Sequence, residues 1–261
     1  WMAWLARSRS SAALAVGGAL HVFAWWLYRA FPKGRGIWRP KGTEAGLEQG
    51  DFVSLSGGRT HYHLEGGAGN ELVVLVHGYS TPSVVFCSLR EHLVSLGYRV
   101  LDFDLYGRGL SEAVEQPMTE DLFCSQLDEL LEALELRGSF RLVGYSMGGA
   151  IATKFSQRRP ELVTHLALIA PAGLPVTVTF AAKLMTLPFV RQRIFATLAP
   201  TIIGASMRAS MAELGTTGDT HALRCRDRIA AHWALQKCNP VYWRSLYFTL
   251  RNFSLGSMRD V

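Results

Sequence analysis

One serine stands where it could act as a nucleophile. Ser146 lies between Gly144 and Gly148, in the Gly-x-Ser-x-Gly spacing that is typical of a nucleophile elbow. At such a turn a strand passes into a helix so sharply that the two backbones nearly touch, and glycine fits there because it has no side chain. The helix that follows directs free N–H groups and the positive end of its dipole at the serine. Negative charge that develops beside Ser146 would therefore be stabilised.

Two further motifs come before the serine, and each follows an apolar run. His77-Gly78-Tyr79 follows the run at 72–76, and the segment 102–111, which contains Gly-Arg-Gly, follows the run at 98–101. The serine turn follows a third run. The carboxyl ends of parallel strands meet at one edge of an open α/β sheet, where ligands bind. We therefore expect the three motifs to form one site.

The elements that must position these motifs can be read from the spacing of apolar residues. Strand-like and helix-like segments alternate from residue 51, which predicts an α/β fold with a mostly parallel sheet and right-handed crossovers. Thr119 is expected to cap a helix, and the apolar-rich run at 163–170 is expected to be a buried strand. The expected strands are 52–55, 60–64, 72–76, 98–102, 141–145 and 163–170, and the expected helices follow residues 83, 119 and 146.

The pattern changes after Pro171. From there on, apolar residues recur at helical spacing without a clear strand, so we expect a helical lid over the edge of the sheet. Pro188 and Pro200 are expected to divide this lid, since proline interrupts helices. The methionines and phenylalanines of the lid could line a pocket, or they could form ordinary packing between helices.

The three motifs together resemble the alpha/beta-hydrolase superfamily. The resemblance covers residues 52–173 clearly and the lid more loosely. The segments 77–82, His-Gly-Tyr-Ser-Thr-Pro, and 144–149, Gly-Tyr-Ser-Met-Gly-Gly, are most similar to the esterase and monoacylglycerol-lipase-type branch. The resemblance implies an alpha/beta-hydrolase fold whose mostly parallel sheet carries a helical lid, with no metal or organic cofactor.

The resemblance also assigns roles to individual residues. Ser146 matches the nucleophile, and the backbone N–H groups of Met147 and Tyr79 match the two donors that stabilise the oxyanion. Removing one such donor typically lowers the rate by about 10²–10³. The residues that would support these motifs without reacting are His77, Gly78, Gly144, Gly148, Asp104, Gly107 and Gly109.

A serine also needs a base, normally a histidine oriented by a carboxylate. In the superfamily this acid and histidine follow the serine in the chain. No apolar strand follows Leu255 before the sequence stops at Val261, and lid or surface packing accounts best for His221, His232 and Asp260. We therefore expect that the chain is truncated before the acid and histidine of its triad, that its core strands are incomplete, and that as given it is inactive or nearly so.

The N-terminal region has a different character. Residues 10–28 carry no charge and are long enough to cross a hydrocarbon core of about 30 Å, with aromatic residues at their C-terminal end. We expect a single-pass N-terminal membrane anchor, and a cleaved secretory signal or an organelle-targeting segment stays open as the alternative. Because the chain begins with Trp1 instead of Met, we also expect that the start of the sequence is incomplete.

These inferences define the expected organisation and function. Ser146 would form an acyl-enzyme with a small carboxylic ester, and the apolar lid and membrane anchor favour a lipid-like one. Hydrolysis of a C–C or amide bond in the same site stays open, as does a non-catalytic, membrane-tethered binding protein.

The excess of basic residues lies within 1–43, so no nucleic-acid partner is expected. The expected parts are the anchor 1–31, the linker 32–50, the incomplete core 51–171, the lid 172–255 and the start of a connection back to the core, 256–261.

Overall fold

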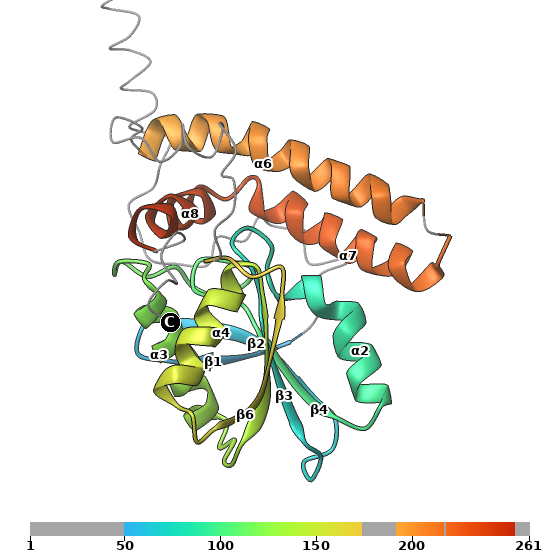
Figure 1. Cartoon of the computed structure of the whole chain (residues 1–261). Helices are drawn as coiled ribbons and strands as arrows, with labels where there is room; N and C mark the ends of the chain where they lie inside the picture. The colour runs from blue at the N-terminus through green and yellow to red at the C-terminus, as the bar shows by residue number, and fades with distance from the viewer. Residues whose placement is uncertain (1–49, 174–191, 217, 254–261) are drawn as a thin grey trace, which may run out of the picture. The chain divides into compact units, whose positions relative to one another are not determined.

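The computed structural model describes residues 50–173, 192–216 and 218–253 (Figure 1). The predicted anchor at 1–31 and the connection at 256–261 lie outside these ranges, as does nearly all of the predicted linker. Within the described ranges the chain forms a sheet with helices on both faces and three further helices, α6, α7 and α8, from the predicted lid.

The sheet has the order β1-β2-β4-β3-β5-β6. β1 and β2 form an antiparallel hairpin, β2 pairs antiparallel with β4, and β4, β3, β5 and β6 run parallel to one another. The predicted mostly parallel α/β sheet is confirmed. The strands are β1 (Asp51–Ser54), β2 (Arg59–Glu65), β3 (Leu72–Val76), β4 (Arg99–Phe103), β5 (Phe140–Tyr145) and β6 (Val163–Ile169).

The helices of the core cover the two faces of this sheet. α3 (Glu120–Ala133) and α4 (Met147–Arg158) pack on one face, and the 3-10 turn η1 (Ser83–Phe86) leads into α2 (Cys87–Ser95) on the other (Figure 1). Thr119 caps α3 as predicted, with its hydroxyl accepting a hydrogen bond from the Leu122 N–H at 3.2 Å.

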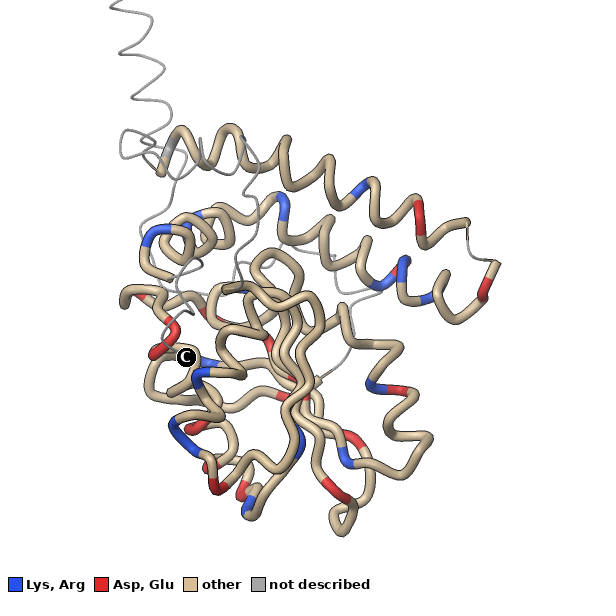
Figure 2. Tube along the Cα trace, in the orientation of Figure 1, with Lys and Arg blue, Asp and Glu red and all other residues tan. Residues whose placement is uncertain are grey.

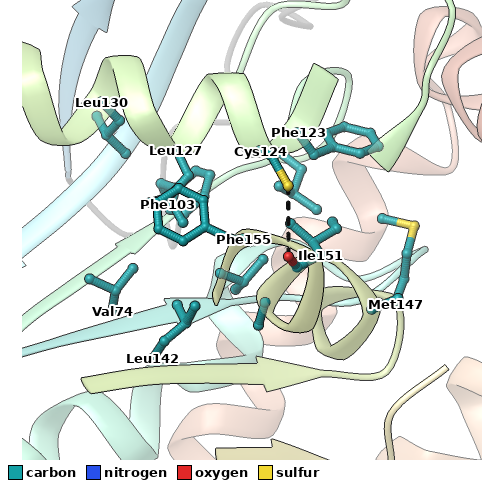
Figure 3. Packing of buried hydrophobic residues seen from close by; sticks show 14 of the residues in the cluster. Val74, Phe103, Phe123, Cys124, Leu127, Leu130, Leu142, Met147, Ile151 and Phe155 are labelled. Carbon is teal, nitrogen blue, oxygen red and sulfur yellow. Dashed lines mark hydrogen bonds between the residues drawn. The ribbon is translucent and has the colours of Figure 1, made fainter. Parts of the chain in front are cut away.

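Both faces of the central strand β3 are buried, which explains its uninterrupted apolar sequence. Val74 and Val76 belong to the cluster formed with α3 and α4, in which Figure 3 labels Val74, whereas Val73 and Leu75 pack towards α2. Alternate side chains of a strand point to opposite faces, so a strand covered on both sides needs apolar residues at every position.

The three remaining helices lie at the carboxyl end of the parallel strands. They are α6 (Gln192–Gly215), α7 (Thr220–Gln236) and α8 (Pro240–Asn252). The loop after β3 contacts two of them, because the Tyr79 hydroxyl donates to the Leu246 carbonyl of α8 at 2.7 Å and the Thr81 hydroxyl lies 3.8 Å from Met207 Sδ of α6. These helices therefore lie over the edge of the sheet at which β3, β4 and β5 end and the three motifs begin.

The prediction that 163–170 is a buried strand is wrong. β6 forms, but Leu166, Leu168 and Ile169 are 38%, 42% and 43% exposed. Among the described residues β6 pairs only with β5, at the end of the sheet. An apolar run predicts a strand, but whether neighbours cover that strand depends on contacts that lie elsewhere in the sequence.

Pro200 does not divide the lid as predicted, because α6 continues through it. Proline removes one backbone donor from a helix interior without always ending the helix. Within the described ranges, the part of α6 from Ile194 to Gly215 is the one helix whose length and apolar composition would suffice to cross a membrane. Core helices of soluble proteins can have the same length and composition. Ile194, Leu198 and Ile202 are 44%, 40% and 40% exposed, and their spacing of four places them along one side of the helix.

Candidate active site

Ser146 occupies the turn between β5 and α4 in a strained conformation. Its φ and ψ are +53° and −118°, which L-residues rarely adopt. Its N–H donates to the Ile169 carbonyl at 2.9 Å, and its carbonyl accepts from Gly149 at 2.9 Å and from Ala172 at 2.8 Å. Because the backbone is held on both sides of Ser146, the strain persists and the side chain projects from the tip of the turn.

The neighbouring glycines allow α4 to touch the sheet directly. A Cβ at Gly148 would lie 2.0 Å from the Val76 carbonyl oxygen of β3, and one at Gly144 would lie 2.6 Å from the Gly149 Cα. Neither position has room for a side chain. The contact brings the N-terminus of α4 to the end of β3, where the His77-Gly78-Tyr79 motif begins.

The His77-Gly78-Tyr79 loop lies beside Ser146. A Cβ at Gly78 would be 3.2 Å from the Ser146 Cβ. Within the described part of the chain, the backbone N–H groups of Tyr79 and Met147 have no hydrogen-bond acceptor. The structure therefore brings the predicted nucleophile together with the loop and the helix start that carry the two predicted oxyanion donors.

His77 shapes this loop and is unsuited to act as a base. The side chain is fully buried, with Nδ1 2.9 Å from the Gly78 carbonyl oxygen and Nε2 2.9 Å from the Leu105 N–H. Since Nε2 accepts from that N–H, the proton must lie on Nδ1. Burial lowers the pKa of His77 to about 4, so the ring is neutral at neutral pH and both nitrogens are engaged.

Asp104 organises the loop after β4. Its carboxylate accepts from the N–H groups of Ser83 and Leu110, each at 2.9 Å, and contacts His61 Nδ1 at 2.8 Å. Burial raises the pKa of Asp104, but the hydrogen bond and charge of His61 outweigh it and hold the pKa well below its usual range. The turn winds tightly around this carboxylate, because Gly109 has φ +53° and a Cβ there would overlap Asp104 Oδ2.

Gly107 brings the same loop against α8. It has φ +75°, and a Cβ at this position would lie 2.2 Å from Ser245 Oγ. The glycines of the second motif therefore serve close packing and unusual backbone angles.

The described residues supply no base for Ser146. None of their histidines or carboxylates hydrogen bonds to its hydroxyl. His221 instead lies 3.2 Å from Glu91 and 3.4 Å from the Ser88 hydroxyl, and His232 is buried within α7. Asp260 lies outside the described residues. No group of three His, Cys, Asp or Glu in these ranges could hold a metal ion.

Arg108 lies at the site although its type and spacing did not predict a role for it. Its side chain is 1% exposed and donates from Nε to the Tyr79 carbonyl at 3.1 Å. The sequence offered one signal, an arginine between Gly107 and Gly109, because closely spaced glycines indicate a tight turn. Its partners come from distant parts of the chain and could not be read from local spacing.

Comparison with known proteins gives one family and several relatives. The profile of the serine aminopeptidase S33 family matches residues 68–238. A 2-hydroxy-6-oxo-6-(2'-aminophenyl)hexa-2,4-dienoic acid hydrolase from Metapseudomonas resinovorans is 33% identical over 129 residues, which cover 49% of this chain and 44% of that protein. Lipase 1 from Psychrobacter immobilis is 31% identical over 131 residues, covering 49% and 40%. The chain thus spans about half the length of the curated relatives it matches.

A solved esterase from Exiguobacterium antarcticum has the same fold. It matches with a TM-score of 0.57 and 20% identity, covering 81% of this chain and 76% of the esterase chain. A likeness at this level of identity concerns the fold alone.

The close approach at Gly148 can be tested by Gly148→Ala. The added methyl group would meet backbone oxygens of Val76 and His77 at 2.0 and 2.5 Å, so α4 must move away from β3. We expect the free energy of unfolding, measured with urea, to fall by about 2–4 kcal/mol. Gly69→Ala is the control, because a Cβ there meets nothing within 4 Å. A Gly148→Ala protein as stable as that control would contradict this contact.

The burial of His77 predicts a dependence of stability on pH. Its pKa falls from 6.5 to about 4 on folding, so between these values the unfolded chain binds more protons. The contribution of His77 is complete above pH 6.5 and decreases by about 3 kcal/mol as the pH falls towards 4. Urea unfolding between pH 7 and 4 should show a larger loss for the wild type than for His77→Gln. Equal losses would show that His77 does not titrate in this way.

Proposed function

The chain belongs to the serine aminopeptidase S33 family of the alpha/beta-hydrolase superfamily, and from this premise we propose that it cleaves a carboxylic ester through Ser146. Ser146 Oγ attacks the carbonyl carbon and gives its proton to a base. The C–O bond to the alcohol breaks, the alcohol leaves with that proton, and the acyl group stays on Oγ. Water then attacks the acyl-enzyme and releases the carboxylic acid.

The observation that supports this proposal best is the setting of Ser146. The side chain stands on a strained turn at the N-terminus of α4, next to Gly78, with unoccupied backbone N–H groups at Tyr79 and Met147 among the described residues. Donors that are fixed before the reaction stabilise the oxyanion of the tetrahedral intermediate without reorganising.

We further propose that the base and its carboxylate partner come from residues outside the described ranges. A serine hydroxyl is a poor nucleophile by itself, and a form of the protein without these groups would have little or no activity. Tests of activity therefore require the native protein.

A lipid-like ester is the substrate class that we propose. α6 exposes Ile194, Leu198 and Ile202 along one side, and no charged residue occurs from Ile194 to Met207 (Figure 2). An exposed apolar surface of this kind suits long acyl chains or a membrane surface. The membrane anchor at 1–31 remains part of this proposal, as does a location at a membrane.

The nucleophile can be tested with a fluorophosphonate probe on the native protein. We expect the wild type to be labelled, and we expect the labelling rate of Ser146→Ala to be at least about 100-fold lower. Ser156→Ala is the matched control, since its hydroxyl donates to the Ala152 carbonyl of the same helix and has no other partner in the described ranges. A native protein that is not labelled would contradict the proposed chemistry and would favour a non-catalytic binding protein.

The substrate class can be tested with a series of esters of increasing acyl length. If an apolar pocket holds the acyl chain, each added methylene contributes about 0.8 kcal/mol, which is about fourfold in kcat/KM until the pocket is filled. A value of kcat/KM that stays constant or falls from the acetyl ester onward would exclude a lipid-like substrate.

A second candidate is cleavage of a C–C or amide bond in the same site. The relative from Metapseudomonas resinovorans is named as a hydrolase of a hexa-2,4-dienoic acid, and the family is named for an aminopeptidase. Comparing kcat/KM for an ester, an aminoacyl anilide and a dienoic keto acid on one preparation would distinguish these chemistries from ester hydrolysis.

A further inference from the structure

Arg108 is a buried cation, and all of its hydrogen-bond acceptors among the described residues are neutral oxygens. Nε donates to the Tyr79 carbonyl at 3.1 Å, Nη1 to the Tyr106 carbonyl at 3.0 Å, and Nη2 to the Thr249 hydroxyl at 2.7 Å. The guanidinium also lies 5.7 and 5.6 Å from the ring centres of Tyr79 and Phe123. Burial lowers its pKa to about 10, so it remains charged at neutral pH. Desolvating a charge is costly, so these contacts are needed to retain it.

Helix α8 contacts the loops after β3 and β4 through three residues on one of its sides. The Tyr242 hydroxyl donates to the Ser80 carbonyl at 2.8 Å, the Leu246 carbonyl accepts from the Tyr79 hydroxyl at 2.7 Å, and Thr249 holds Arg108. Positions separated by four and three residues lie on the same side of a helix. One side of α8 therefore faces the loops that follow β3 and β4.

These contacts fix Tyr79 at three points. Its own carbonyl is held by Arg108, its side chain by α8, and the following carbonyl, of Ser80, by Tyr242. On the other side of the Tyr79 Cα, the Gly78 carbonyl shares a peptide plane with the Tyr79 N–H and accepts from His77 Nδ1 at 2.9 Å. Because groups on both sides of this Cα are fixed, the backbone angles of Tyr79 are restricted, and so is the direction of its N–H. That N–H is the group that would donate to the oxyanion.

We propose that Arg108 and Tyr242 are positioning residues, through which docking of α8 on the loop orients the Tyr79 N–H and completes the oxyanion site. This inference rests on the proposed role of Ser146. It adds that the site is competent only while α8 is seated, so movement of this helix would turn the reaction on and off.

The kinetic test uses single-group deletions in the native protein. Tyr242→Phe removes the hydrogen bond to Ser80, and Thr249→Val removes an acceptor of Arg108, each with little change in shape. For both variants we expect kcat to fall about tenfold while KM changes by less than about twofold, because oxyanion stabilisation acts on the transition state. Thr249→Ser, which keeps the hydroxyl, should restore kcat. Tyr98→Phe, on the far side of the core beside Arg141, is the control for loss of a tyrosine hydroxyl.

A second measurement does not depend on catalysis. Hydrogen exchange of the peptide covering residues 78–85 should become faster in Tyr242→Phe and Thr249→Val, and it should stay unchanged in Tyr98→Phe. A wild type without esterase activity would refute the proposed function, and the exchange rates would still decide whether α8 holds the loop. Unchanged kcat, unchanged exchange in both variants, or failure of Thr249→Ser to restore kcat would overturn the inference.

Discussion

The direct contact of α4 with the ends of β3 and β5 is the constraint on which the rest of the site depends. Gly148 lies against the Val76 carbonyl, and Gly144 lies against the first turn of α4. With α4 this close to the sheet, Ser146 keeps a positive φ while its N–H and carbonyl are bonded to Ile169, Gly149 and Ala172. It also brings the positive end of α4 next to the loop after β3, so the sheet, the helix and the loop define one point in space.

Two buried charges hold the loops around that point, and they are satisfied in opposite ways. Asp104 accepts hydrogen bonds from backbone N–H groups and contacts His61, so it ties the loop after β4 to the start of η1. Arg108, four residues later, donates to carbonyl and hydroxyl oxygens and ties the same loop to Tyr79 and to α8. A single loop therefore connects the sheet with the helices above it, because each charge can be buried only where several elements supply partners.

Much of this arrangement could be predicted from the sequence, since it rests on local patterns. Apolar runs gave the strands, a threonine followed by acidic residues gave the start of α3, and the glycine spacing gave the turn at Ser146. The exposure of β6, the continuity of α6 through Pro200 and the role of Arg108 could not be predicted in this way. Each depends on which distant segments pack nearby. Arg108 and Thr249 are 141 positions apart, and the spacing of apolar residues cannot predict a contact between residues so far apart in the chain.

The contacts of α8 differ in kind along its length, and this difference bears on how the site could be controlled. Tyr242, Trp243 and Leu246 share an apolar cluster with Phe195 of α6, so these two helices are packed to each other. Phe253, which follows α8, packs in the main core, 6.2 Å from the Phe123 ring. Between these attachments, two hydrogen bonds join α8 to the loop after β3 and a third joins Thr249 to Arg108 in the loop after β4. Together these three bonds contribute about 3–5 kcal/mol. Bonds of that strength can break and reform without unfolding the core, so the proposed movement of α8 would leave its C-terminal end attached. A site that assembles by polar contacts of this size is intact in most molecules and still opens often enough to exchange substrate and product.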